Sequence, residues 1–279
     1  MSPADVALSK PIKIREVWSD NLESEITLLS DLVDRYPFIS MDTEFPGVIY
    51  KLQEDPTGRR PSPSDHYRIL KSNVDALKLI QLGITLSDSA GNLPALGSDG
   101  ELCIWQFNFS DFDADRDPHA TDSIELLRSK GVDFERSRRY GVDSARFAEL
   151  VMGSGLVCNE DVSWFTFHSA YDFGYLVKIL TGRLLPARIG EFMDVIKAFF
   201  GDNVYDVKYL MRLCESFHGG LNLAARAMDV DRLVGKCHQA GSDSLMTWHA
   251  FQKMREMYFL QQGHEKFAGV LYELQSVVK

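Results

Sequence analysis

The chain has 279 residues, of which 45% are hydrophobic and 25% charged, a composition typical of a globular protein with enough apolar material for a sizeable core. Its formal net charge is −10, from 30 basic and 40 acidic residues. This balance argues against a protein that binds nucleic acid through its overall charge, because phosphate contacts come from Lys and Arg.

The cysteines and the hydropathy of the chain exclude further classes of protein. The four cysteines are scattered without a pairing pattern, which favours reduced thiols over a disulfide framework. No stretch approaches the roughly 18 apolar residues of a membrane span. Residues 1–13 have no apolar run of the signal-peptide type, so the sequence predicts an intracellular protein with no membrane partner.

Order is predicted to begin near residue 14, after a flexible N-terminal tail over 1–12. A first helix is expected over 21–36, because apolar residues recur there at spacings of three and four: Leu22, Ile26, Leu29 and Val33.

A buried strand carrying two acids is predicted next, over 38–45. Side chains alternate faces along a strand, so Asp42 and Glu44 point the same way, about 7 Å apart. Acids among apolar neighbours must be paired or must hold a metal ion. The alternative is an exposed edge strand with two solvated acids, and the spacing alone leaves both possibilities open.

Two further strands would complete an antiparallel meander whose first member carries these acids. Residues 54–66 hold three prolines and predict a surface loop. The segment 73–86 becomes β-branched and apolar towards its end, and 101–109 alternates as a third strand.

Helices dominate the rest of the chain. Apolar periodicity and glycine stops predict them over 123–130, 144–152, 173–180, 189–200, 207–217 and 221–228, with a long last helix from about Ser242. A short apolar strand, 164–167, precedes the third of these. The basic run 136–139 favours a solvated face over an RNA-binding rim. No linker divides the elements, so one domain is the simplest prediction.

Three acidic clusters stand out, and each has an ordinary structural alternative. Asp42 and Glu44 form the first. Asp172 follows the short strand where a helix begins, where an acid favours the helix N-terminus in any case. His238 and Asp243 form the third, where Ser242 or Asp243 could cap the last helix and His238 could be a surface-loop histidine.

Together the clusters contain the residues that two-metal phosphodiester hydrolysis needs. That reaction uses carboxylates that hold two ions about 3.5–4 Å apart. Hard oxygen ligands suit Mg²⁺ or Mn²⁺ better than Zn²⁺. A neutral histidine beside the attacking water can take its proton near pH 7.

The pattern resembles that of the DEDD exonucleases, in the branch with a histidine base, which share a ribonuclease H-like fold. The flanking residues resemble more specifically the Pop/Caf deadenylase subunit of the CCR–NOT complex, with a plant-like character, over roughly 14–259. Five segments carry the likeness: MDTEFPG (41–47), KLIQLGIT (78–85), FHSAYDFGYL (167–176), YDVKYLM (205–211) and HQAGSDSLMT (238–247).

This resemblance implies an α/β fold with a mixed central sheet, its first three strands antiparallel, flanked by helices. It implies a 3′–5′ exoribonuclease domain over 13–262, with 263–279 as a C-terminal tail or helix. The implied reaction shortens mRNA poly(A) tails and releases AMP with two divalent ions, Mg²⁺ or Mn²⁺. The implied partners are the poly(A) 3′ end, the CCR–NOT scaffold subunit and a second deadenylase subunit, in the cytoplasm and nucleus.

Carried over residue by residue, the resemblance gives roles to five positions. Asp42 would bridge both metal ions, Glu44 and Asp243 would complete the tighter site, and Asp172 the looser one. His238 would orient and deprotonate the water. Two alternatives remain: a scaffold subunit with little intrinsic activity, and a general 3′–5′ exonuclease without poly(A) preference.

The sequence gives weaker evidence for the residues that contact the substrate than for the five positions above. Phe45 and Phe173 flank the acids and could stack a base, a contact worth roughly 1–3 kcal/mol, although core packing is favoured for both. His168 could contact a phosphate or pack beneath Asp172. The other reaction classes fit poorly, because Cys237 and His238 match no compact zinc knuckle and no nucleophile elbow is present.

Overall fold

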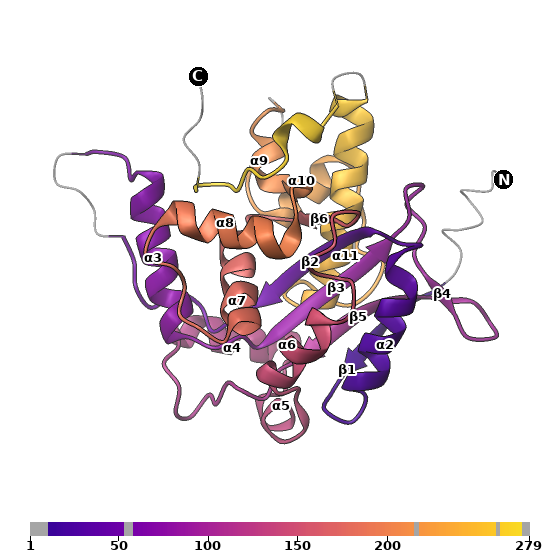
Figure 1. The fold of residues 1–279 in the computed structure, drawn as a ribbon, viewed down its shortest axis with the longest axis horizontal. Helices are drawn as coiled ribbons and strands as arrows, with labels where there is room; N and C mark the ends of the chain where they lie inside the picture. The colour runs from indigo at the N-terminus through magenta and orange to yellow at the C-terminus, as the bar shows by residue number, and fades with distance from the viewer. Residues whose placement is uncertain (1–10, 53–57, 215–217, 261–262, 275–279) are drawn as a thin grey trace.

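The structure, a computed structural model, describes residues 11–52, 58–214, 218–260 and 263–274. One mixed β-sheet crosses the middle of the molecule, and helices cover both of its faces (Figure 1). The predicted α/β class with helices flanking a mixed central sheet is therefore confirmed. None of the described helices is long and apolar enough to cross a membrane.

The strands lie in the order β1-β5-β3-β2-β6-β7, with β4 paired to β5. Their bounds are β1 Ile12–Val17, β2 Phe38–Glu44, β3 Gln81–Ser87, β4 Ala95–Leu96, β5 Glu101–Asn108, β6 Ser163–Thr166 and β7 Val204–Asp206. Strands β2, β3 and β5 pair antiparallel, as the predicted meander requires. Strands β6 and β7 extend the sheet from β2 in parallel, and β1 is parallel to β5. The run from β5 to β7 has the topology of the ribonuclease H-like fold.

The helices lie mostly where the apolar periodicity predicts them, and α6 and α8 have the predicted bounds. The helices are α2 Leu22–Val33, α3 Pro63–Ala76, α4 Thr121–Lys130, α5 Phe134–Tyr140, α6 Ser144–Met152, α7 Ala170–Thr181, α8 Ile189–Phe200, α9 Val207–Met211, α10 Leu221–Ala227 and α11 Ala240–Met254. A π-helical turn, Arg255–Phe259, continues α11, and a 3₁₀ helix follows at Glu265–Phe267.

Helix α3 corrects the predicted surface loop over 54–66. The helix begins at Pro63, because Ser62 and Asp65 form a capping box that satisfies the first free backbone N–H groups. The proline that indicated a loop is the first helical residue, a position that tolerates proline. Residues 53–57 of the predicted loop lie outside the described residues.

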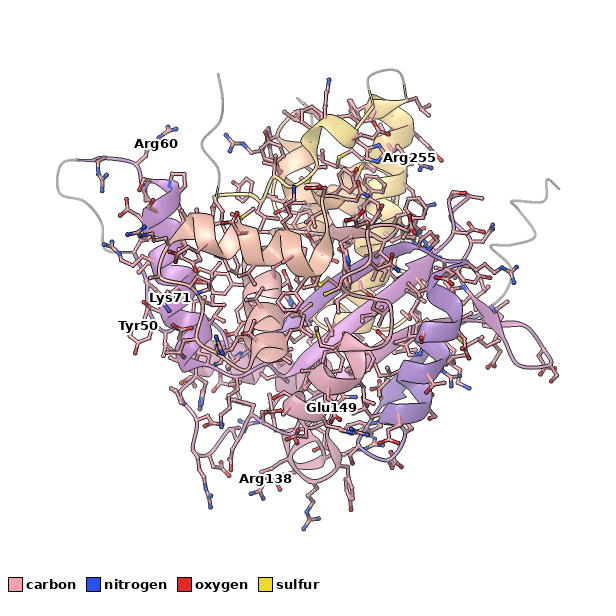
Figure 2. All side chains as sticks on the ribbon, viewed as in Figure 1. Tyr50, Arg60, Lys71, Arg138, Glu149 and Arg255 are labelled. Carbon is pink, nitrogen blue, oxygen red and sulfur yellow. The ribbon has the colours of Figure 1, made fainter. Side chains whose placement is uncertain are left out.

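Helix α5 was not predicted and contains the basic run 136–139. Its arginines are exposed, and Arg138 projects from the surface (Figure 2). Arg136 lies 4.2 Å from the ring centroid of Trp18, and Arg138 pairs with Glu135 at 3.4 Å. These contacts fit the predicted solvated face.

The described residues form three apolar clusters, and the two larger ones fill the space between the sheet and its helices. The larger lies against α2, α3, α7 and α8, and the second lies between the sheet and α9, α10 and α11. The predicted core stripe of α11 is confirmed, because four of its members are at most 2% exposed: Leu245, Trp248, Phe251 and Met254.

The segment 263–274 packs beside the edge strand β7. The Gly269 N–H donates to the Val204 carbonyl at 2.8 Å, and the Tyr272 N–H donates to Asp206 Oδ2 at 3.0 Å. Leu271 and Leu274 are 1% and 3% exposed. The described part of the predicted tail thus belongs to the packed structure.

A close approach of α11 to the sheet at Gly83 determines where the helix begins. Gly83 pairs with Asp42 across β2 and β3. A Cβ atom at Gly83 would lie 1.9 Å from the Ala240 carbonyl oxygen, so only glycine permits this contact. The Gly241 N–H donates to Gln106 Oε1 at 3.0 Å, and Thr85 Oγ1 contacts Ser244 Oγ at 2.8 Å. The first turn of α11 is therefore fixed directly over the acidic strand.

Replacing Gly83 with alanine tests this contact. We expect Gly83→Ala to lower the free energy of unfolding by about 1–3 kcal/mol. It should also weaken Mn²⁺ binding, because backbone atoms of α11 must move away from Asp42. Gly190→Ala is the matched control, since no atom lies within 4 Å of a Cβ there and the site is helical. Thermal unfolding and Mn²⁺ titration measure both effects. Equal melting temperatures for the two variants would contradict the expectation.

Candidate active site

Three carboxylates from β2 and α11 meet in one place. Asp42 and Glu44 lie on the same face of β2, and Asp243 lies in the first turn of α11. One carboxylate oxygen from each lies within 4.8 Å of the others. Glu44 is 9% exposed and Asp243 is 6% exposed. The exposed edge strand that the spacing left open is therefore excluded.

Asp172 joins this group from α7. It lies in the first turn of that helix and is 7% exposed. Thr43, between the two acids of β2, donates its hydroxyl hydrogen bond to Asp172 Oδ1 at 2.5 Å. Asp172 is close enough to Asp42 and Glu44 to raise the pKa of both. All four predicted acids thus come together at the junction of β2, α7 and α11.

Burial and mutual repulsion disfavour the charged forms of these acids. Burial, followed by the charges of Asp243 and Asp172, raises the Asp42 pKa well above its ordinary value. The same causes raise the Glu44 pKa to about 8. Burial raises the Asp172 pKa to about 6, against the hydrogen bond from Thr43. The protein alone therefore supplies too little positive charge for four ionised carboxylates.

One cation that the sequence analysis missed, Arg232, partly offsets this repulsion. Its Nη2 donates to Asp243 Oδ1 at 2.5 Å and to Asn222 Oδ1 at 2.8 Å. Its Nη1 donates to Ser242 Oγ. Arg232 precedes α11 in an irregular segment, where sequence periodicity gives no signal. Its contacts fix the Asp243 carboxylate and connect the segment before α11 to α10.

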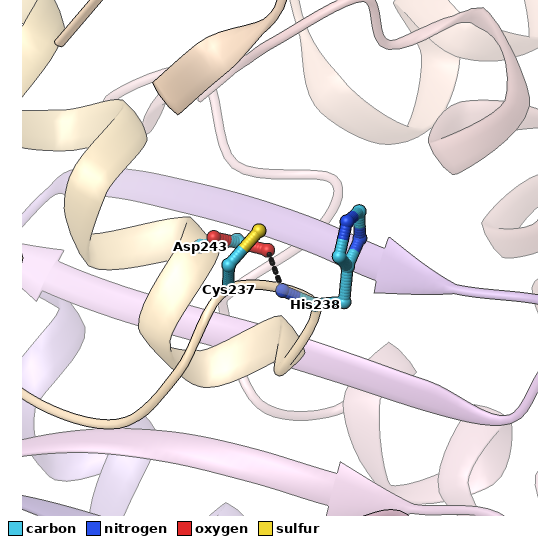
Figure 3. A group of neighbouring side chains, drawn as sticks. All are labelled: Cys237, His238 and Asp243. Carbon is cyan, nitrogen blue, oxygen red and sulfur yellow. Dashed lines mark hydrogen bonds between the residues drawn. The ribbon is translucent and has the colours of Figure 1, made fainter. Parts of the chain in front are cut away.

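His238 lies at the rim of the acidic group, just before α11. Its backbone N–H donates to Asp243 Oδ2 at 2.8 Å (Figure 3), and a nitrogen of its ring lies within 4.8 Å of an oxygen of that carboxylate. The backbone of His238 has φ 62°, a left-handed conformation that costs free energy outside glycine. Since Gln239 is the N-cap of α11, the helix-capping alternative for Asp243 is wrong.

Asp42, Glu44, Asp243 and His238 line a cavity of about 480 Å³ whose other wall is apolar, and Asp172 lies behind Thr43, which also lines the cavity. That wall consists of Phe45, Phe167, Leu221 and Leu223. Phe45 stacks on Tyr171, with ring centroids 5.2 Å apart and planes at 13°. Leu223 is 61% exposed and leaves an apolar surface open to a ligand. A planar base on this wall would lie beside the carboxylates.

Two of the predicted substrate contacts do not face this cavity. Phe173 is fully buried and packs edge-on against Phe200 at 4.9 Å, so a role in base stacking is wrong and core packing holds. The His168 ring is 3.3 Å from Glu273 Oε2 and packs edge-on against Tyr272 at 4.9 Å. His168 is therefore directed towards the C-terminal segment.

Asp206 is a second residue that the sequence analysis missed. It is 1% exposed at the end of β7. Its two oxygens accept hydrogen bonds from the backbone N–H groups of His168, Ser169, Lys208 and Tyr272 and from the Ser169 hydroxyl. It therefore holds the turn that leads into Asp172. An acid between a short strand and a short helix, within YDVKYLM, was the available signal.

The donor set fits divalent cations. No described residue donates a hydrogen bond to the side-chain oxygens of Asp42 or Glu44, although both lie in a largely buried site. One guanidinium, Arg232, faces four acids there. Two divalent ions would supply the missing charge, and carboxylate oxygens suit Mg²⁺ or Mn²⁺.

Cys237 adds one soft ligand beside this group. Its sulfur lies within 4.8 Å of ligand atoms of His238 and Asp243, and it accepts a hydrogen bond from Asn222 Nδ2 at 2.9 Å. Cys158 and Cys214 are not part of any metal-binding group that the described residues form. A compact zinc knuckle is therefore absent from the described part of the chain.

Comparison with known proteins gives one family. Residues 17–149 match the model of the CAF1 family ribonuclease. The chain is 54% identical to "Probable CCR4-associated factor 1 homolog 7" of Arabidopsis thaliana, over 94% of each chain. It is 45% identical to "Poly(A) ribonuclease pop2" of Schizosaccharomyces pombe, over 94% of this chain and 75% of that one.

Solved structures agree with the sequence comparison. The S. pombe Pop2p structure in its Mg²⁺- and Mn²⁺-bound form has a TM-score of 0.85 at 43% identity, covering 94% of this chain and 99% of that one. Yeast CAF1, co-crystallised with the NOT1 MIF4G domain, has a TM-score of 0.76 at 29% identity, over 98% and 99% of the two chains. The ribonuclease H-like fold is confirmed by this agreement.

The raised pKa values predict how metal-free stability depends on pH. In the folded state, Glu44 (pKa about 8) and Asp172 (pKa about 6) retain protons that the unfolded chain loses above about pH 4.5. The free energy of unfolding should therefore fall as pH rises from about 4.5 to 8. In EDTA, we expect the wild-type melting temperature to fall by at least about 2 °C more than that of Glu44→Gln over this range.

Scanning calorimetry at several pH values, with and without Mn²⁺, measures this difference. Saturating Mn²⁺ should remove most of the wild-type fall, because the ions compensate the ionised carboxylates. Parallel curves for the wild type and Glu44→Gln in EDTA would show that repulsion at this site does not limit stability.

Proposed function

The chain belongs to the CAF1 family of ribonucleases, and we propose that it is a 3′–5′ exoribonuclease that shortens mRNA poly(A) tails and releases AMP. The observation that carries this proposal is the meeting of three carboxylates and a histidine in one cavity with an apolar wall, with a fourth carboxylate, Asp172, held beside them by Thr43. The S. pombe relative named a poly(A) ribonuclease supports the choice of substrate. We further propose that residues 13–262 form the catalytic domain.

The four carboxylates would hold two divalent ions. In this proposal Asp42 would serve both ions, Glu44 and Asp243 would complete the tighter site, and Asp172 would complete the looser one. The ions would supply positive charge to the attacking and leaving oxygens of the phosphodiester. Thr43 fixes the orientation of Asp172, and Arg232 fixes that of Asp243, through the hydrogen bonds described above.

His238 acts on the water in this scheme. The imidazole takes a proton from the water while the water oxygen forms a bond to the phosphorus of the last nucleotide. The bond between that phosphorus and the 3′ oxygen of the preceding nucleotide breaks. Solvent protonates the leaving oxygen, and AMP is released together with a strand one nucleotide shorter.

The cavity wall offers a place for the last nucleotide. Phe45 adjoins Glu44 in the chain and is held flat by its stacking on Tyr171. A terminal adenine on Phe45 or Leu223 would bring its ribose hydroxyls towards Glu44, which could accept their hydrogen bonds. This arrangement would favour a free 3′ end, since an internal nucleotide has no 3′ hydroxyl.

Partners and location follow from the relatives. Yeast CAF1 has been co-crystallised with the NOT1 MIF4G domain, which supports a scaffold subunit of the CCR–NOT type as a partner of this chain. The name CCR4-associated factor, borne by the Arabidopsis relative, supports a second deadenylase subunit as another partner. We propose that the protein acts in mRNA decay in the cytoplasm and also in the nucleus.

Cleavage of labelled RNA tests the activity. We expect the purified protein with Mg²⁺ to shorten 5′-labelled oligo(A) one nucleotide at a time and to release AMP. Asp42→Asn should lower the rate at least about a hundredfold, or ~2.7 kcal/mol in the barrier. Substrates ending in C or U distinguish a poly(A) enzyme from a general exonuclease. Intact substrate with the wild type would favour the alternative of a scaffold subunit.

The role of His238 is tested by separating turnover from metal binding. We expect His238→Gln to reduce turnover by roughly 10²–10⁴-fold, because the water loses its proton acceptor. Its Mn²⁺ affinity should stay close to that of the wild type, whereas Asp243→Asn should lose both. Isothermal titration and single-turnover kinetics measure the two properties. An equal loss of Mn²⁺ in His238→Gln would indicate a ligand instead of a base.

A further inference from the structure

A second pocket, of about 380 Å³, lies outside the acidic cavity and is basic. It is lined by α9, by the loop before α10 and by the C-terminal segment, which lie together in the upper part of the molecule in Figure 1. The lining residues are Lys208, Met211, Arg212, His218, Gly219 and Tyr272. None of them was assigned a role from the sequence.

Lys208 connects this basic pocket to the acidic cavity. Its Nζ lies 5.6 Å from the ring centroid of Phe167 and 5.7 Å from that of Tyr272. Phe167 lines the acidic cavity and Tyr272 lines the basic pocket. Gly219 and its neighbour Gly220 line the basic pocket and the acidic cavity, respectively. A chain molecule could therefore pass from one to the other.

The two cations of the basic pocket form no direct ion pair with any described acid. Among the described residues, no carboxylate oxygen lies within 4.0 Å of the Lys208 ammonium or the Arg212 guanidinium. Arg212 lies 5.7 Å from the centroid of Tyr272 and is exposed. The hydrogen bond from His168, followed by nearby positive charges that include Lys208, lowers the pKa of Glu273, whose direct contacts are to His168 at 3.3 Å and to His66 at 3.6 Å.

The positive charge gathered at the basic pocket contrasts with the net charge of the whole chain, which is −10. Lys208 also donates a hydrogen bond to the Gly219 carbonyl, which holds its side chain at the mouth of the basic pocket. One donor of three is used in that bond. A pre-positioned ammonium, a guanidinium and an aromatic ring together are suited to a phosphate carried on a nucleotide.

We propose that the basic pocket binds a backbone phosphate of the RNA on the 5′ side of the bond that is cut, an inference that rests on the proposed function. The scissile phosphate is the last phosphate of a strand with a free 3′ hydroxyl. Any further phosphate that reaches the basic pocket must therefore belong to an upstream nucleotide. Lys208 and Arg212 contact that phosphate, and Tyr272 packs beside its sugar or base.

Substrate length separates this phosphate from the scissile one. The dinucleotide ApA has a single phosphate, which is the one cut, whereas A₂₀ supplies upstream phosphates. Lys208→Gln and Arg212→Gln should raise KM for A₂₀ about tenfold each, with little change in kcat. For ApA, kcat/KM should change less than about twofold. Arg183→Gln is the matched control, because Arg183 is exposed beyond the far end of α7, about 16 Å further along than Asp172.

Salt dependence gives a readout that does not need activity. On an Asp42→Asn background, fluorescence anisotropy measures the affinity for labelled A₂₀ at several salt concentrations. Each of the two substitutions should reduce the slope of log affinity against log salt by about 0.7, the value for one phosphate contact on a single strand. Arg183→Gln should leave the slope unchanged.

The outcomes separate the two proposals. If the wild type cuts A₂₀ but the Lys208 and Arg212 variants match it in KM and in salt slope, the basic pocket does not bind RNA, and a protein partner becomes the better explanation of its charge. If the Lys208 and Arg212 substitutions lower kcat/KM equally for ApA and for A₂₀, the two residues act on the scissile phosphate or on the fold. If the wild type cuts neither substrate, the proposed function fails, and the salt titration still decides whether the pocket binds RNA.

Discussion

Mutual repulsion among four clustered carboxylates, three of them buried, is the constraint on which the rest of this structure depends. Asp42, Glu44, Asp172 and Asp243 are held close together although burial and neighbouring charge raise the pKa of the first three. Left alone, such a group lowers the stability of the fold. Divalent cations would neutralise these charges. The same four acids therefore lower the stability of the metal-free protein and provide the metal ligands for catalysis.

The fold keeps the acids together through contacts that are not themselves acidic. Gly83 lets α11 lie against the sheet, so that Asp243 comes over Asp42. Asp206 accepts five hydrogen bonds, three of them from the turn before α7, which fixes the position of Asp172. Arg232 secures the segment that carries His238. Each of these contacts restricts a movement by which the carboxylates, which repel one another, would otherwise separate.

Charge is distributed unevenly around this site. The acidic chain has little general attraction for RNA, and the carboxylates themselves repel phosphate. The basic pocket around Lys208 and Arg212 supplies local attraction beside the acidic cavity. The affinity of the chain alone for RNA is therefore expected to be weak, which suits an enzyme that partner proteins bring to its substrate.

Much of the fold and of the acidic group was predictable from the sequence, for physical reasons. Alternation identified the strands and the common face of Asp42 and Glu44, and apolar spacing identified the core stripe of α11. The gathering of Asp172 and Asp243 was expected through a family resemblance, because residues so distant in sequence have no local signal. Arg232, Asp206 and the pocket of Lys208 escaped prediction, since their roles arise from tertiary contacts of irregular segments. The sequence left base stacking open for Phe173 beside the favoured core packing, because adjacency to an acid does not determine which way a helical side chain points.

The central claim is that these four acids hold two divalent ions. Anomalous diffraction from crystals soaked in Mn²⁺ tests it most directly. The account predicts two manganese peaks about 3.5–4 Å apart, with Asp42 between them, and the loss of at least one peak in Asp172→Asn. A single peak, or none, at full Mn²⁺ saturation would contradict it.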